Sequence, residues 1–252
     1  MRSMTRWLAM TVMVFGLCSS AWGSLINVKF QHLETSNPDP GYTGPGIVGK
    51  AGDFWNLVLA NSNIGGYNVW TRDSAGKETV GADPNIEPGG IMMDCNPQGM
   101  SLSTTIPNFT DSSYDLLMRG YLTTTATGEA PDLIKFSNLP ANSPFDLYLY
   151  SQPESSTLPL YVSVNGSIPV TIDGDSSLTA FVQGGNYEKF STTSDANGEL
   201  LINVFADYNF GSAAINALQL QSVSSPAAVP EPSTYALLAL GFGGMMFVRR
   251  RK

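Results

Sequence analysis

Histidine is almost absent from this sequence, which has one, His32, among its 252 residues. Nucleophilic catalysis most often needs a histidine base beside the nucleophile, and His32 follows a predicted strand, where an edge or surface position is expected. Gly-x-Ser-x-Gly, His-Glu-x-x-His and paired Cys-x-x-Cys motifs are also absent. These absences argue against hydrolases built on a serine or cysteine nucleophile and against zinc sites. The many carboxylates leave a carboxylate-based glycan-cleaving enzyme open as an alternative.

Cysteine is equally scarce, with Cys18 and Cys95 as the two examples. Cys18 lies within the N-terminal residues 1–23, which are expected to be removed, so Cys95 has no partner for an intramolecular disulfide. The fold must therefore be held by its core, and about 200 residues suffice for one sizeable domain.

Positive charge is rare between the two ends of the chain. Seven of the 13 Lys and Arg, but 20 of the 21 Asp and Glu, lie within residues 24–223, so the net charge there is 7 − 20 = −13. Phosphate binding needs clustered cations, which excludes nucleic acid as a partner. The excess of acidic groups suits solubility outside the cell and binding of divalent cations.

The sequence also lacks an apolar run long enough for a permanent membrane anchor. The C-terminal run, residues 235–248, has 14 uncharged residues, whereas a spanning helix needs about 20. At the other end, Arg2 and Arg6 precede the apolar residues 7–17, and Ala21-Trp22-Gly23 fits a small-x-small cleavage site. Residues 1–23 are thus predicted to be a signal peptide cleaved between Gly23 and Ser24.

Three modules follow one another at the C-terminus: the tripeptide Pro230, Glu231 and Pro232, the apolar run, and the basic residues Arg249, Arg250, Arg251 and Lys252. The prolines disfavour helix before the run, and the cations resist translocation. Residues 229–252 strongly resemble the PEP-CTERM sorting signal of bacteria, with residues 224–228 as a linker. The resemblance implies export, recognition by an exosortase-type processing enzyme, transient residence of the apolar helix in the inner membrane, and delivery to the cell surface or extracellular matrix.

Short alternating apolar runs, bounded by turn residues, recur between the two ends. They predict strands at 25–30, 100–106, 133–136, 145–150, 160–164, 168–172, 178–182, 187–192, 199–205 and 214–220, with a helical turn within 112–119. Asn165-Gly166 is the strongest hairpin signal. Because no crossover helices separate the strands, residues 24–223 are predicted to be all-β, an antiparallel β-sandwich.

A further resemblance rests on the order of Leu116–Leu122, Phe136–Pro140, Asp146–Tyr150 and Ala214–Leu220. This pattern is similar to jelly-roll domains found ahead of PEP-CTERM tails, which in turn resemble galactose-binding-like modules. No cofactor is expected, although galactose-binding-like folds often carry a structural calcium ion, so the resemblance leaves such an ion open. Asp173 and Asp175, on one turn, are the candidate ligands, since calcium prefers clustered oxygens. A hairpin turn that uses Asp and Gly for backbone reasons is the competing interpretation.

Sugar binding needs an aromatic ring that stacks on a pyranose, with polar groups beside it. Trp70, Arg72 and Tyr208 are the candidates, whereas Trp55 is expected to pack in the core. The leading hypothesis is a non-catalytic, structural or adhesive protein of the cell surface or matrix. A carbohydrate-binding module that holds polysaccharide is the first alternative.

Overall fold

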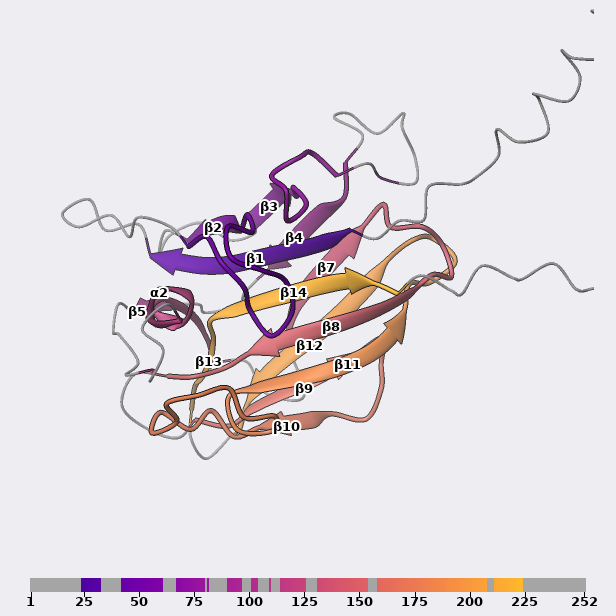
Figure 1. Ribbon diagram of the computed structural model, residues 1–252. Helices are drawn as coiled ribbons and strands as arrows, with labels where there is room; N and C mark the ends of the chain where they lie inside the picture. Colours follow the sequence, from indigo (N-terminus) through magenta and orange to yellow (C-terminus); the bar gives the residue numbers. More distant parts are fainter. Residues whose placement is uncertain are drawn as a thin grey trace, which may run out of the picture.

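The computed structural model describes residues 24–32, 42–60, 67–79, 81, 90–96, 101–103, 109, 114–125, 131–153, 158–207 and 211–223. These residues form two large sheets, a small third sheet and one short helix (Figure 1). The predicted signal peptide, the linker, the sorting tail and Tyr208 lie outside the described residues.

The first sheet has five strands in the order β11-β8-β14-β1-β2. Their bounds are β1 Leu25–His32, β2 Asn56–Ala60, β8 Pro144–Tyr150, β11 Tyr187–Thr193 and β14 Ala217–Ser222. All neighbours are antiparallel except β1 and β2, which run parallel. This single parallel pair departs from the wholly antiparallel prediction.

The second sheet has six strands in the order β10-β9-β12-β7-β4-β3, all antiparallel. Its strands are β3 Tyr67–Trp70, β4 Met92–Asn96, β7 Asp132–Ser137, β9 Leu160–Val164, β10 Val170–Ile172 and β12 Leu200–Ala206. A small sheet has the order β13-β6-β5, with β5 Ser101–Ser103, β6 Tyr121–Thr124 and β13 Ala213–Ile215. Helix α2, Asp115–Met118, confirms the predicted helical turn.

The core lies between the two large sheets. Alternate residues of the facing strands, such as Val28, Leu147, Ile134 and Ile202, are fully buried there. In β7 and β12 every second residue is buried and the residues between are partly exposed, as an antiparallel sheet with one solvated face requires. The predicted β-sandwich is therefore confirmed, and the described residues include no helix long and apolar enough to cross a membrane.

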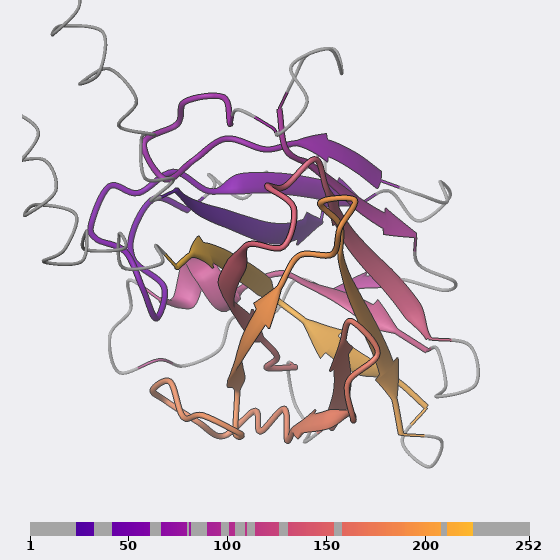
Figure 2. The ribbon, with the colours of Figure 1, turned by 90° about the vertical axis from the view of Figure 1, so that its right-hand side faces the viewer.

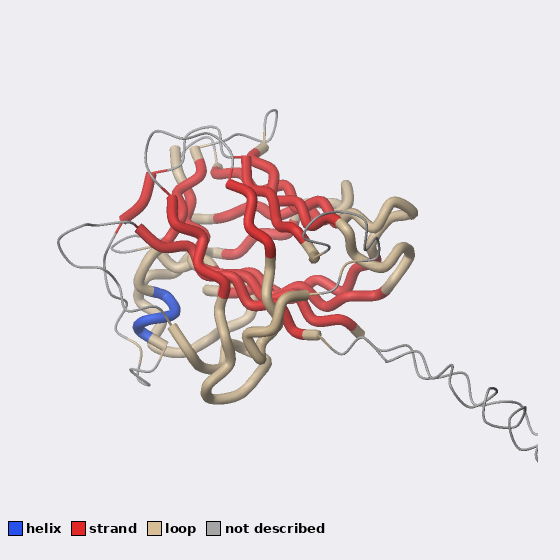
Figure 3. The backbone as a smooth tube through the Cα atoms, turned by 90° about the horizontal axis from the view of Figure 1, so that it is seen from above, coloured by secondary structure: helices blue, strands red, loops and turns tan. Residues whose placement is uncertain are grey.

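The opposite face of the five-stranded sheet is covered by loops. Seen from above, loops and helix α2 gather on one side of the strand layers (Figure 3). Segment 42–55 is held on this face because the N–H of Ile47 donates to the Tyr150 hydroxyl (2.6 Å) and the Gln219 amide donates to Val48 O (3.0 Å). A side chain on Gly46 would collide with the Tyr150 hydroxyl and the Gln219 amide, so glycine is required for this close approach.

The two ends of the domain meet at one point. Leu25 of β1 pairs with Gln221 of β14, and the Ser222 N–H donates to Ser24 O (3.2 Å). Figure 2 views the molecule from this end. The first and last described residues of the sandwich therefore lie side by side.

Two predicted strands are corrected by the structure. Residues 178–182 form a loop, since the Leu178 N–H donates to Asp175 O and Val182 O accepts from the N–H groups of Gly185 and Asn186. The predicted strand 214–220 is divided at Asn216, whose side-chain amide donates to Met118 O (2.8 Å) and Gly120 O (3.3 Å).

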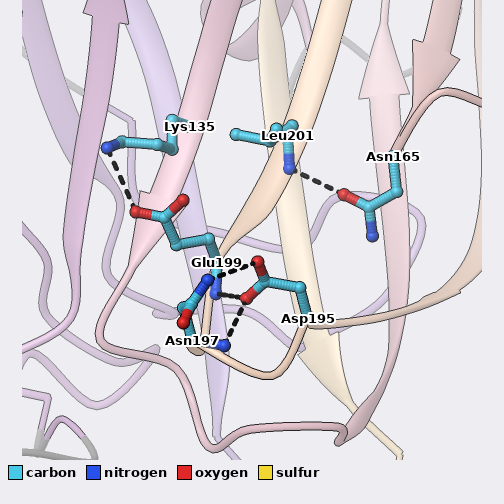
Figure 4. A network of polar contacts seen from close by, with 6 residues as sticks. All are labelled: Lys135, Asn165, Asp195, Asn197, Glu199 and Leu201. Carbon is cyan, nitrogen blue, oxygen red and sulfur yellow. Dashed lines mark hydrogen bonds and ion pairs between the residues drawn. The ribbon is translucent and has the colours of Figure 1, made fainter.

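The predicted Asn165-Gly166 hairpin is confirmed between β9 and β10. Both residues have positive φ, 49° and 73°, as a type I′ turn needs. The Asn165 side chain accepts from the Leu201 N–H (2.9 Å, Figure 4) and donates to Thr193 O (2.8 Å), so it also links the hairpin to the first sheet. Nearby, Asp195 accepts from the N–H groups of Asn197 and Glu199, which lowers its pKa, and Glu199 pairs with Lys135 at 3.3 Å.

Candidate functional site

Trp70 lies at the end of the edge strand β3, opposite Met92 of β4. The sequence predicts no strand at Trp70, and its place in β3 corrects that prediction. Neither β3 nor β4 has a strong local pattern, and Tyr67–Trp70 is a strand because it pairs with β4. The side chain is 36% exposed. Arg72 is exposed as well, whereas Thr71 between them is buried, so the two face outward together.

Two further side chains complete this surface. The Arg72 guanidinium lies over the Phe54 ring, 5.9 Å from its centroid, and the Arg72 backbone pairs with that of the exposed Glu78 in an isolated antiparallel β-bridge. We call the group Phe54, Trp70, Arg72 and Glu78 the Trp70 edge. It offers an aromatic face, a guanidinium and a carboxylate, the side-chain types that bind a sugar through its rings and hydroxyls.

The backbone of the Trp70 edge is fixed by a buried amide. Asn56, 4% exposed, accepts from the Arg72 N–H (2.7 Å) and donates to both Arg72 O (2.8 Å) and Asn27 O (2.9 Å). A neutral amide buried with its hydrogen bonds satisfied adds rigidity without an uncompensated desolvation cost. Arg72 is therefore positioned before any ligand arrives.

A second set of hydrogen bonds fixes the chain on both sides of Trp70. The Thr71 hydroxyl donates to Ile91 O (2.9 Å), the Thr79 hydroxyl donates to Thr71 O (2.9 Å), and the Ile91 N–H donates to the Thr79 hydroxyl (2.9 Å). Asn138 extends the network by donating to Gly90 O (3.0 Å). Asp73 closes the following turn by accepting from two backbone N–H groups. The segment around Trp70 is thus rigid on both sides.

Tyr208, the third predicted sugar-binding residue, lies outside the described residues, so the structure does not bring it to the Trp70 edge or separate it from it. Its neighbour Asp207 accepts a hydrogen bond from the Tyr161 hydroxyl (3.1 Å), which raises the pKa of Tyr161. Tyr161 stacks on Phe205, with ring centroids 5.3 Å apart and 9° between the planes. Sequence reasoning missed this group. The alternation in the two segments could have shown it, because it places Tyr161 and Phe205 on the outer face of the neighbouring strands β9 and β12.

Asp173 and Asp175 lie in the loop between β10 and β11. One Asp175 oxygen accepts from both the N–H (2.8 Å) and the hydroxyl (2.7 Å) of Ser177, and these bonds lower the pKa of Asp175. Among the described residues, no group of three or more His, Cys, Asp or Glu is placed to hold a metal ion. Calcium takes six to eight oxygen ligands, so an ion held here would need oxygens besides those of the two aspartates.

Cys95, in β4, is fully buried. Burial raises the pKa of its thiol to about 12, and the negative charges of Asp132 and Asp94 add to this effect. A thiol that stays protonated at neutral pH is a poor nucleophile and a poor metal ligand. Cys95 is therefore a packing residue of the core.

Residues 228–252 match the family model described as the PEP-CTERM protein-sorting motif. No curated protein matches the sequence. The chain is similar to several solved structures, all at low identity. They include the plant receptor-like kinase ANX2, at 11% identity and a TM-score of 0.39, with 52% of this chain and 40% of that chain covered. A calcium-binding mutant of Bacteroides uniformis β-glucuronidase 2 is similar at 13% identity and a TM-score of 0.39, with 67% of this chain and 20% of that chain covered.

A family 35 carbohydrate-binding module from Clostridium thermocellum is also similar, at 15% identity and a TM-score of 0.31, with 52% of this chain and 90% of that chain covered. The chain thus spans less than half of the first two structures and most of the third. The sequence match at the C-terminus is the informative one: residues 228–252 are a PEP-CTERM sorting motif, and this protein is exported.

Proposed function

We propose that this protein is a non-catalytic, adhesive component of the cell surface or extracellular matrix, and that it holds polysaccharide at the Trp70 edge. The observation that carries the proposal is the Trp70 ring, 36% exposed, beside an arginine whose backbone is fixed by the buried Asn56. A tryptophan that ends an edge strand with about a third of its surface exposed offers that part of its ring for stacking on a pyranose.

The Trp70 edge suits weak, repeated contact with a polymer. One ring and one guanidinium provide a single sugar subsite, and their fixed backbone reduces the ordering cost of binding. Many copies held at a surface would then bind one polysaccharide with high avidity. Tyr208 remains a prediction for the same function, as does structural calcium at Asp173 and Asp175.

The route to the surface follows from the sorting motif. An exosortase-type enzyme recognises Pro230, Glu231 and Pro232 while the apolar run is in the inner membrane, and the basic end marked by Arg249, Arg250 and Arg251 stays on the cytoplasmic side. Processing then releases the sandwich to the surface or the matrix.

Retention on a panel of immobilised polysaccharides tests the proposal. We expect Trp70→Ala to abolish retention of the exported protein and Arg72→Ala to weaken binding about tenfold, the loss expected when a charged hydrogen bond of roughly 1.4 kcal/mol is removed. Val182→Ala is the matched control, because Val182 is 46% exposed and lies in the β10–β11 loop. It should be retained like the unmodified protein.

The same panel separates the alternatives. Equal retention of Trp70→Ala and the unmodified protein would reject this site, and release of reducing ends would favour a carboxylate-based glycan-cleaving enzyme instead. A parallel run with a chelator tests calcium, since loss of retention or of thermal stability would indicate a bound ion.

A further inference from the structure

An apolar strip on the surface is found at the edge of the six-stranded sheet. Ile168, just before β10, is 88% exposed, more than any other large apolar side chain in the part of the chain described, and Val170 in β10 is 39% exposed. Pro169 and Thr171 are exposed too. We call residues 168–171 the β10 edge. Single exposed apolar residues are ordinary on protein surfaces, but here four adjacent exposed residues carry no charge, so the whole edge is uncharged.

The strip has no charged side chain that would prevent its association with other molecules. No Asp, Glu, Lys, Arg or His occurs from residue 158 to residue 172, although residues 24–223 carry a net charge of −13. Edge strands are commonly protected from pairing by charged side chains. The edge strand of the other sheet on this side, β11, has Glu188 and Lys189, and Lys189 pairs with Asp146 at 2.8 Å. The β10 edge has no such protection.

The hairpin that presents the strip is held in position. The Ser163 hydroxyl donates to Ser167 O (2.7 Å), and the Val164 N–H donates to the Ser167 hydroxyl (3.1 Å). Asn165 connects the turn to Thr193 and Leu201. Since the turn before Ile168 is fixed, binding at the strip needs little further ordering.

We propose that the β10 edge binds the same edge of a second copy of this chain, related by a two-fold axis. A neutral strip is self-complementary in such an isologous contact, and it is where two strongly acidic molecules can approach with least repulsion. Pro169 has no N–H to donate and β10 has three residues, so the interface is small and the association weak. The contact would link neighbouring copies at a crowded surface, and it is independent of sugar binding.

Sedimentation velocity of the exported protein over a range of concentrations tests the proposal. We expect a monomer–dimer equilibrium that added salt strengthens, because salt screens the repulsion between acidic copies. The double substitution Ile168→Lys with Val170→Lys should weaken dimerisation at least about tenfold. The matched control, Val182→Lys with Val223→Lys, makes the same charge change at side chains 46% and 40% exposed and should leave the dimer intact.

A cross-link tests the contact itself. Cys95 is buried, so the substitution Ile168→Cys introduces the one accessible thiol among the described residues. Oxidation should join two copies of Ile168→Cys, whereas Val182→Cys should stay monomeric. Because Ile168 is 88% exposed, the substitution should leave the melting temperature unchanged. A monomer at every concentration, equal loss of dimer in the control, or equal cross-linking of both variants would overturn the proposal.

Discussion

Asn56 shows how much of the candidate site depends on one buried side chain. It occupies both hydrogen-bonding groups of the Arg72 backbone and also reaches Asn27 O. Arg72 itself is exposed, so its own packing cannot position it. The position of the guanidinium over Phe54 therefore depends on Asn56, a buried residue that cannot itself contact a ligand.

We expect Asn56→Ala to cost about 2–3 kcal/mol in unfolding free energy, because it leaves partly buried backbone groups unpaired. Polysaccharide retention should fall as well, since Arg72 loses its fixed position. Denaturant unfolding and the retention assay measure the two effects. Asn197 lies in an exposed turn, where its side-chain amide donates to Asp195. Asn197→Ala should change the unfolding free energy by no more than a few tenths of a kcal/mol and should leave retention unchanged.

Cys95 gives a pH dependence that can be assigned to one residue. Burial raises the pKa of its thiol from 9.0 to about 12. The folded state therefore keeps the proton above pH 9, where the unfolded chain loses it, so stability is fully present below pH 9 and falls as the pH rises toward 12. At one pH unit above 9, the unfolding free energy is expected to be lower by about 1.4 kcal/mol because of Cys95.

Cys95→Ala should remove this part of the alkaline slope, even though it lowers stability at neutral pH by leaving a small cavity. Denaturant unfolding between neutral and mildly alkaline pH measures both proteins. The pKa of Tyr150 is also raised by burial, and it contributes to the slope of both proteins alike. Identical slopes for the two proteins would show that the thiol does not titrate as described.

At the scale of elements, strands with strong local patterns were predicted correctly and strands that depend on pairing were missed. The runs that became β1, β7, β8, β9 and β12 alternate in the sequence, so their buried faces could be predicted. β2, β3, β4 and β6 were not predicted. β3 and β4 contain Asn68 and Asp94, which face each other across the pair, and only the pairing makes these segments strands.

The β9–β10 hairpin and the β11–β12 turn are held together by Asn165. Asn165→Gly keeps the positive φ of the turn but removes the bonds to Leu201 and Thr193. We expect it to destabilise the protein by about 1 kcal/mol, and Asn165→Ala to cost about 1 kcal/mol more because alanine disfavours this conformation. Thermal unfolding of both variants measures the order. If Asn165→Gly is as stable as the unmodified protein, the link between the sheets contributes nothing.

At the scale of the whole molecule, the sorting motif and the sandwich are separate parts of the chain. The sorting motif covers residues 228–252, and the last strand of the sandwich ends at Ser222, which bonds to Ser24 just before β1. β14 is the central strand of the five-stranded sheet, between β8 and β1. Because this strand comes last in the sandwich, the sheet can close only when residues 217–222 are present.

Replacing Pro230, Glu231 and Pro232 by alanine should leave the protein unprocessed in the membrane fraction, since the processing enzyme loses the motif while the apolar run remains. Cell fractionation with an antibody against the sandwich measures the distribution. Alanines at Ser224 and Ser225, in the linker, should leave sorting unchanged. Release of the substituted protein into the medium would contradict a role for this tripeptide.

The sequence by itself determined that the protein is exported and that its fold is all-β. A sorting signal is read from a contiguous stretch, and alternation in a strand is local, so neither needs the tertiary structure. Trp70 and Arg72 could also be named in advance, as two polar-flanked residues two positions apart.

Only the tertiary structure decided how those residues are held in place. The amide of Asn56, 16 positions before Arg72, fixes its backbone, and a loop covers one face of the five-stranded sheet while the β10 edge stays exposed. Such facts depend on which distant segments pack together, and burial and hydrogen bonding between distant residues leave no periodic trace in the sequence.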